Sequence, residues 1–217
     1  TCIGIPKTID NSNQNIFHIG ESHCLSYAHQ SIQLGALHYT IRPRIIFGAK
    51  TWHFSQSREN QFKGLFSQHL SSIPNGSKLF LSFGEIDCRD DEGILKFKKK
   101  SKKNLNQIIN ETVEGYVDWV TKQSKEKKYE LFFLGIPAPV IDITQKGSKK
   151  STPPDRILLI KQFNQALANA VHSKGHNFVD VYSFTRNQFG VSNGDYHLDQ
   201  YHLAPVALKK IEQQLNN

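Results

Sequence analysis

The chain lacks methionine entirely and has only three cysteines among its 217 residues. Without an initiator methionine, the sequence is expected to be a processed chain or a fragment. Cys2, Cys24 and Cys88 are too few and too widely spaced for a disulfide framework or a paired metal motif. We expect Cys24 and Cys88 to be small buried residues, and a disulfide between them stays open.

Long apolar runs are also missing, and none approaches the roughly 20 residues of a membrane span. Residues 1–14 are polar and show no signal-peptide pattern. These absences favour a soluble protein without a transmembrane segment, in the cytoplasm rather than outside the cell.

Acidic residues are absent from residues 96–103, which carry six lysines and are called the lysine segment below. The net charge is +8, so the rest of the chain carries only +2. The segment is either a solvated loop or a site of attraction for an anionic partner, such as an acidic glycan, a phosphorylated surface or nucleic acid. Nucleic acid is the weakest of these interpretations, because the segment has one aromatic residue and no arginine.

Strand and helix patterns alternate along the chain. Strands are expected at residues 15–19, 39–47, 78–83, 130–134 and 177–182, and helices at 22–34, 57–72 and 104–125, after Pro153-Pro154 and from Pro205. This alternation predicts one α/β domain over residues 1–217, a three-layer α/β/α structure with a five-stranded parallel sheet. Residues 1–14 would be a polar N-terminal extension, and residues 88–103 a basic loop insertion.

Three residues far apart in the sequence carry the chemistry of a serine hydrolase. Ser22 follows the first apolar run, and Asp199 and His202 lie three residues apart near the other end. A serine hydroxyl can act as nucleophile, an imidazole can take its proton, and a carboxylate can orient the imidazole. Each residue also has a structural interpretation, since Ser22 and Asp199 could cap helices and His202 could be a packed surface residue.

Glycine-containing turns follow two further expected strands, at Gly48 and at Gly84–Asp87. Parallel α/β sheets bind ligands beyond the carboxyl ends of their strands, so these turns should lie near Ser22. No metal or other cofactor is predicted, because the histidines follow no compact zinc spacing; they are His18, His23, His53, His197 and His202. His23 and His53 are interpreted as pocket-rim or helix residues.

Taken together, these motifs resemble the SGNH (GDSL-type) hydrolase superfamily over nearly the whole chain. Gly20-Glu21-Ser22 is similar to its first block, Gly-Asp-Ser, and Asp199-Gln200-Tyr201-His202 matches its Asp-x-x-His block. Gly48 resembles the second-block glycine, whose amide joins that of the serine in the oxyanion hole. The resemblance implies a flavodoxin-like three-layer domain (the SGNH hydrolase fold) and an activity as esterase, lipase, glycan deacetylase or acyltransferase.

The third block departs from the family, which has Gly-x-Asn-Asp where this chain has Gly84-Glu85-Ile86-Asp87. Isoleucine cannot donate a hydrogen bond to an oxyanion, and one lost donor typically costs about 100- to 1000-fold in turnover. The Ser22 and Gly48 amides could suffice, Lys50 or Arg89 could substitute, or hydrolysis could be lost while binding remains.

The resulting hypothesis is a serine esterase with the triad Ser22, His202 and Asp199, which acts through an acyl-enzyme. Its substrate would be a small acyl ester of a carbohydrate or another polar molecule. The pocket residues would be Glu21, Lys50, Glu85 and Asp87. The alternatives are a non-catalytic glycan- or protein-binding module on the same fold, and an O-acyltransferase.

Overall fold

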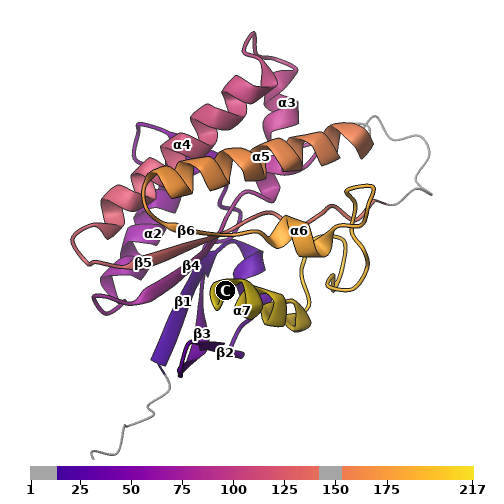
Figure 1. Cartoon of the computed structure of the whole chain (residues 1–217). Helices are drawn as coiled ribbons and strands as arrows, with labels where there is room; N and C mark the ends of the chain where they lie inside the picture. Colours follow the sequence, from indigo (N-terminus) through magenta and orange to yellow (C-terminus); the bar gives the residue numbers. More distant parts are fainter. Residues whose placement is uncertain (1–13, 142–152) are drawn as a thin grey trace, which may run out of the picture.

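The computed structural model describes residues 14–141 and 153–217, and one sheet organises them (Figure 1). Within these residues the sheet has six strands in the order β2-β3-β1-β4-β5-β6. All neighbouring strands are parallel except β2 and β3. The strands are β1 (Gln14–Gly20), β2 (Ser31–Leu34), β3 (Leu37–Ile45), β4 (Lys78–Ser82), β5 (Glu130–Leu134) and β6 (Asn177–Val179).

Helices cover both faces of the sheet. The α-helices are α1 (Thr51–Ser55), α2 (Gln61–Ser71), α3 (Ile94–Lys98), α4 (Leu105–Ser124), α5 (Pro153–Ser173), α6 (Val181–Thr185) and α7 (Leu208–Leu215). In the part of the chain that the structure describes, three short 3-10 helices accompany them: η1 (Ser22–Leu25), η2 (Ile86–Cys88) and η3 (Pro205–Ala207). Figure 1 shows α4 and α5 on one side of the strands and α7 on the other. The expected three-layer α/β/α class is therefore confirmed.

The core divides at the sheet, because successive side chains of a strand point to opposite faces. In β1, Phe17 and Ile19 belong to the cluster that α1, α2, α4 and α5 cover. Ile16 belongs to the cluster on the other face, which includes Leu208 and Ile211 of α7. Burial on both faces explains why residues 16–20 of β1 are all buried, with His18 as the one polar side chain among them.

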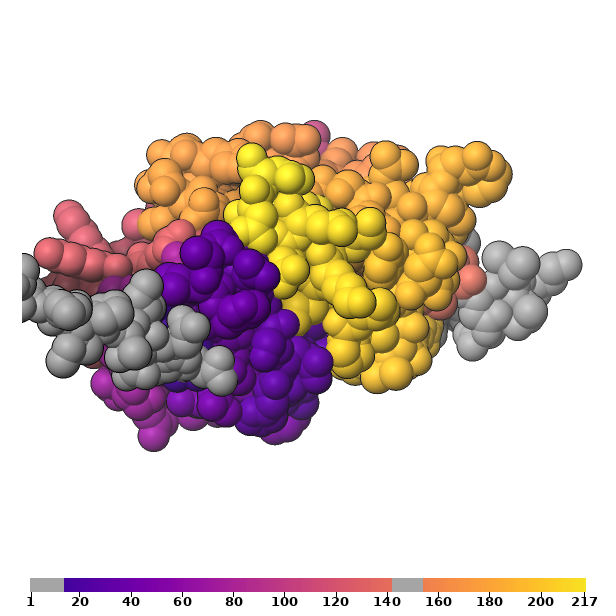
Figure 2. All heavy atoms as spheres, turned by 60° about the horizontal axis from the view of Figure 1, so that its bottom comes forward, coloured from indigo at the N-terminus to yellow at the C-terminus, as the bar shows by residue number. Residues whose placement is uncertain are grey.

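The helix expected at residues 22–34 is wrong. One 3-10 turn, η1, follows Ser22, and the chain turns at His29, which has a positive φ of 61°. Ile32 and Leu34 then alternate with exposed neighbours in β2, which pairs antiparallel with β3 and adds a sixth strand to the five that we expected. Glu212 of α7 accepts the Gln33 N–H at 2.7 Å, so the last helix holds this edge strand. Figure 2 shows the first strands (indigo) against the last helix (yellow).

Several other helices and strands begin or end a few residues away from their expected positions. The helix placed at 57–72 begins at Gln61, where Asn60 caps it, and a separate short helix, α1, precedes it. The strand placed at 177–182 ends at Val179 because α6 follows. The expected loop at 88–103 contains helix α3. Most of the expected N-terminal extension lies outside the described residues. No helix of the described part is long and apolar enough to cross a membrane.

Candidate active site

Ser22 lies directly after β1, at the carboxyl edge of the sheet. The turn before it is tied to both neighbouring strands, since the Ile46 N–H donates to the Gly20 carbonyl at 2.8 Å and the Glu21 N–H donates to the Ser82 carbonyl at 3.3 Å. A Cβ at position 20 would collide with the Ser82 side chain, so only glycine allows this close approach. The local sequence therefore fixes Ser22 between the ends of β3 and β4.

Ser22, His202 and Asp199 form a hydrogen-bonded series. His202 Nε2 lies 2.9 Å from Ser22 Oγ, and His202 Nδ1 lies 2.8 Å from Asp199 Oδ2. The backbone N–H groups of Tyr201 and His202 donate to Asp199 Oδ1 at 2.7 and 2.8 Å. Burial by itself would raise the pKa of Asp199, but these N–H groups and the His202 ring outweigh it and lower the pKa to about 2. The carboxylate is thus ionised and holds His202 Nδ1–H, which leaves Nε2 for Ser22.

The Ser22 hydroxyl has a second hydrogen-bond partner. Its Oγ lies 2.8 Å from Glu21 Oε2, to which it donates. A hydroxyl carries one hydrogen, so it donates either to Glu21 or to His202 Nε2 at any one time. Rotation about the Cβ–Oγ bond moves the proton between the two acceptors without moving the oxygen.

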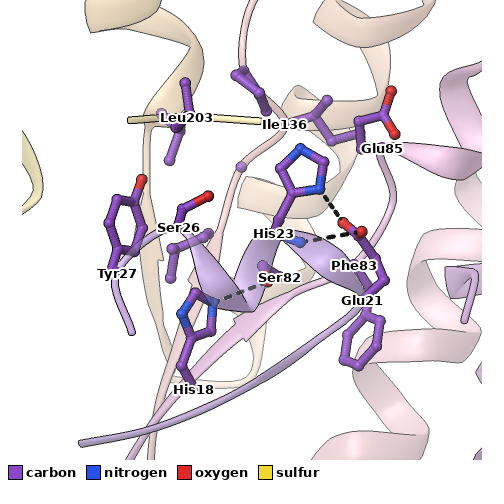
Figure 3. A pocket seen from close by; sticks show the side chains of 14 residues that line it. His18, Glu21, His23, Ser26, Tyr27, Ser82, Phe83, Glu85, Ile136 and Leu203 are labelled. Atoms are coloured by element: carbon purple, nitrogen blue, oxygen red, sulfur yellow. Dashed lines mark hydrogen bonds and ion pairs between the residues drawn. The ribbon is translucent and has the colours of Figure 1, made fainter. Parts of the chain in front are cut away.

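A buried acid–histidine pair lies beside this series (Figure 3). His23 Nδ1 lies 2.5 Å from Glu21 Oε1, and His23 Nε2 lies 2.9 Å from the Tyr201 carbonyl. Burial by itself would lower the pKa of His23, but the hydrogen bond and charge of Glu21 outweigh it and raise the pKa to about 9. His23 is therefore an imidazolium at neutral pH. Its ring centroid lies 5.0 Å from that of His202.

Glu21 and His23 line a small, partly open cavity of about 30 Å³ (Figure 3). On its wall, His18 Nε2 lies 2.9 Å from Ser82 Oγ, and burial lowers the pKa of His18 to about 3. Within the described residues, His18 Nδ1 and Ser26 Oγ have no hydrogen-bond partner. The volume suits about one or two water molecules, which could satisfy these atoms. This cavity is too small for a substrate.

The backbone N–H groups of Ser22 and Gly48 are the next feature of the site. Among residues 14–141 and 153–217, neither N–H donates to a backbone carbonyl outside the helices and strands. Gly48 has a positive φ of 67°, which favours glycine there. Ile86 is buried in η2 and carries no side-chain donor. These two amides are the oxyanion donors that the sequence proposes.

The four predicted pocket residues separate into two groups. Glu21 and Glu85 line the 30 Å³ cavity, whereas Lys50 and Asp87 line a different cavity of about 520 Å³. Asp87 accepts the N–H groups at the start of α1, from Thr51 at 2.8 Å and Trp52 at 3.2 Å. Burial raises the pKa of Asp87 to about 6, although these donors act in the opposite direction.

Two side chains considered as substitute oxyanion donors are held by acidic residues. Arg89 Nε donates to Glu85 at 2.8 Å, and its guanidinium lies 4.4 Å from the centroid of the Tyr201 ring. Lys50 Nζ donates to the Glu92 carbonyl at 2.8 Å. Cys24 and Cys88 are both free and buried, so no disulfide joins them.

The Glu21–His23 pair and its contact with Tyr201 are not predictable from the sequence motifs. The sequence predicts His23 only as a pocket-rim or helix residue, and Tyr201 occupies a variable position inside the Asp-x-x-His motif. The available signal was the sequence Glu21-Ser22-His23, which places a carboxylate and an imidazole on either side of the serine. Their burial and contact depend on how the 199–203 segment closes over η1.

A mostly parallel sheet between helical layers, with a serine after the first strand and a late Asp-x-x-His, is typical of the SGNH hydrolase fold, and this chain has that fold. Its structure is similar to a protein assigned as an acylhydrolase from Bacteroides fragilis (TM-score 0.59, 17% identity, covering 95% of this chain and 88% of that one). It is also similar to a GDSL-like lipase from Bacteroides thetaiotaomicron (TM-score 0.57, 14% identity, covering 93% of this chain and 85% of that one). A third similar structure is that of a protein assigned as an SGNH hydrolase from Slackia heliotrinireducens (TM-score 0.56, 12% identity, covering 94% of this chain and 97% of that one).

The resemblance inferred from the sequence motifs is thus confirmed at the level of the fold. No family model matches the sequence, and no curated protein matches it.

Proposed function

We propose that the protein is a serine esterase of the SGNH type, with Ser22 as nucleophile, His202 as general base and Asp199 as the residue that orients His202. The observation that carries this proposal is the series of contacts of 2.9 and 2.8 Å from Ser22 through His202 to Asp199. Each residue could be structural alone. Their hydrogen-bonded arrangement at the carboxyl edge of the sheet supports a shared chemical role.

The reaction begins when the Ser22 hydroxyl turns from Glu21 to His202 Nε2. His202 takes the proton as Oγ attacks the ester carbonyl, and the Ser22 and Gly48 amides stabilise the tetrahedral oxyanion. Collapse of this intermediate breaks the ester bond, and His202 returns the proton to the leaving alcohol. Water then attacks the acyl-enzyme with His202 as base, which releases the carboxylic acid and restores Ser22.

The substrate that we propose is a small acyl ester of a carbohydrate or of another polar molecule. The large cavity beyond β3 and β4 has polar as well as aromatic walls, and the lysine segment adjoins it. These surroundings favour a hydrophilic substrate over a long lipid chain. An acyltransferase would use the same acyl-enzyme with a sugar hydroxyl in place of water.

Hydrolysis of p-nitrophenyl acetate and labelling by a fluorophosphonate probe test the proposal. Ser22→Ala should abolish both. Ser192→Ala is a matched control, because Ser192 Oγ lies 2.8 Å from His197 Nδ1 in another serine–histidine contact. The control variant should keep both signals. Full activity in Ser22→Ala would place the nucleophile elsewhere.

A non-catalytic binding module is the second candidate, and two observations favour it. Ser22 donates to Glu21, and Ile86 supplies no oxyanion donor. A folded wild-type protein that neither reacts with the probe nor hydrolyses esters would support this alternative.

A further inference from the structure

A cavity of about 520 Å³ lies beside the candidate active site, at the same edge of the sheet. Its walls include Lys50 and Trp52, which follow β3, and Asp87, which follows β4. These two strands flank β1, whose end carries Ser22. The cavity therefore adjoins the turn that holds Gly48, and its volume is in the usual range for small-molecule sites.

Exposed aromatic side chains gather at this cavity. Within the described residues, four phenylalanine or tryptophan side chains are exposed: Phe47, Trp52, Phe97 and Phe189. Trp52 and Phe97, which are 49% and 52% exposed, line the cavity, and Phe47 directly precedes Gly48. Half-exposed rings at the wall of a cavity are suited to cover the apolar C–H face of a sugar ring.

The charged side chains that line the cavity are held by protein partners, since Asp87 accepts the N–H groups of Thr51 and Trp52. Lys50 pairs with Glu92 at 3.4 Å, and Lys103 pairs with Glu111. The carboxylates of these pairs, with Ser55 and Gln56, offer acceptors and donors for sugar hydroxyls.

The segment that supplies Phe97 and Lys103 to the cavity carries further lysines outside it. Helix α3 bears Phe97 and part of the lysine segment, and it packs against α4 (Figure 1). Five lysines of the segment form no salt bridge with any acid in the part of the chain that the structure describes: Lys96, Lys98, Lys99, Lys100 and Lys102. An aromatic lining whose charged groups are already partnered, beside lysines without acidic partners, suits a ligand that has sugar rings and additional negative charges.

We propose that this cavity is a binding site for an acidic oligosaccharide, with a sugar ring against Trp52 and Phe97 and the acidic groups of neighbouring sugars near the unpaired lysines. The inference deepens the proposed esterase function and rests on it, because the bound polymer would present its acyl ester to Ser22.

Binding can be separated from catalysis in the Ser22→Ala variant of the full chain. Calorimetry at low salt would compare three probes: an octamer of galacturonic acid, a neutral malto-octaose, and an aspartate octapeptide. We expect the galacturonic acid octamer to bind more tightly than both other probes. Equal affinity for the aspartate peptide would overturn the proposal, since it would show attraction to charge alone.

Variants identify the surface that binds. Trp52→Ala and Phe97→Ala should each weaken binding of the acidic octamer about tenfold, as for anchor residues of an interface. The variant in which Lys96, Lys98, Lys99 and Lys100 become glutamine should weaken it by a similar factor and lose most of its salt dependence. Thermal melts would confirm that each variant is folded.

A matched control removes four lysines at the opposite end of α4, which is about 30 Å long. Changing Lys122, Lys125, Lys127 and Lys128 to glutamine alters the net charge equally and should leave the affinity unchanged. An equal loss in this control would overturn the assignment of the site. Wild-type hydrolysis of p-nitrophenyl acetate is scored separately. Tight binding without hydrolysis would contradict the esterase proposal alone. Hydrolysis without binding would contradict the proposed oligosaccharide site alone.

Discussion

Two acid–histidine pairs lie side by side in this protein, and they differ in their exposure to solvent. In the Asp199–His202 pair, the side chains are 51% and 30% exposed, whereas Glu21 and His23 are almost completely buried. The two imidazole rings are only 5.0 Å apart. The same two types of side chain thus occur in two environments within one site.

The imidazole of the buried pair has no nitrogen available to take a proton from a reactant. Both His23 nitrogens are occupied, by Glu21 and by the Tyr201 carbonyl, and the raised pKa keeps the ring charged at neutral pH. His202 has one nitrogen held by Asp199 and the other directed at Ser22. We conclude that burial makes the first pair a fixed structural ion pair, while the second is placed to exchange a proton.

Removing one histidine at a time should separate these roles most strongly. We expect His202→Ala to lower ester hydrolysis by about a thousandfold or more, to near background, because triad members act as a unit. Its melting temperature should change little, since the ring is partly exposed. Steady-state kinetics and thermal melts check both parts, and substantial activity in His202→Ala would assign the general base to another residue.

The next largest effect should be on stability, from the buried pair. His23→Leu leaves the Glu21 carboxylate buried without its cation, and such a loss costs about 3–5 kcal/mol. Denaturant unfolding measures this cost. The double variant Glu21→Gln/His23→Leu should recover at least about 1 kcal/mol, because no uncompensated charge remains. Purely additive losses would show that the two groups do not interact.

The pH dependence of stability should also report the buried pair. An unfolded histidine releases its proton near pH 6.5, whereas His23 in the folded protein keeps it until about pH 9. The folded state binds the extra proton between these values, so raising the pH from 6.5 to 8.5 should remove on the order of 2 kcal/mol of the stability that His23 contributes. His18, whose pKa is lowered by burial, acts in the opposite direction over this range, so the Glu21→Gln variant is needed to isolate the His23 contribution. Unfolding curves across this range test the sign. Glu21→Gln should flatten the profile, and an unchanged slope would exclude His23 as its source.

The smallest effect concerns the proposed oxyanion hole, because Ile86 has no side-chain donor at the position of the family's asparagine. We expect Ile86→Asn to raise kcat about tenfold, roughly 1.4 kcal/mol, with a smaller change in KM, because the new hydrogen bond would form mainly in the transition state. Ile86 is buried, and a buried amide without partners costs about 1–3 kcal/mol. Melts must therefore accompany the kinetics. A stable variant without gain would show that position 86 does not face the oxyanion.

The sequence predicted the main elements of the fold because their patterns are local. Five apolar runs became strands, and the long helix α4 lies where its periodic apolar face indicated. The helix predicted at residues 22–34 is wrong because the apolar residues there fit a helix as well as a short strand. Pairing with β3 and the contact between Gln33 and Glu212 decided for the strand, and both depend on residues distant in the sequence.

For the candidate site, the sequence alone determined the chemical identities: a serine after a strand, an Asp-x-x-His near the other end, and an isoleucine in place of a donor. Only the tertiary structure decided that Ser22 Oγ and His202 Nε2 lie 2.9 Å apart, although the two residues are 180 positions apart in the sequence. It also decided that Glu21 and His23 are buried together and that Lys50 and Asp87 belong to another cavity. The physical reason is that distances and desolvation arise from packing between distant segments, whereas residue type and periodicity are properties of the local chain.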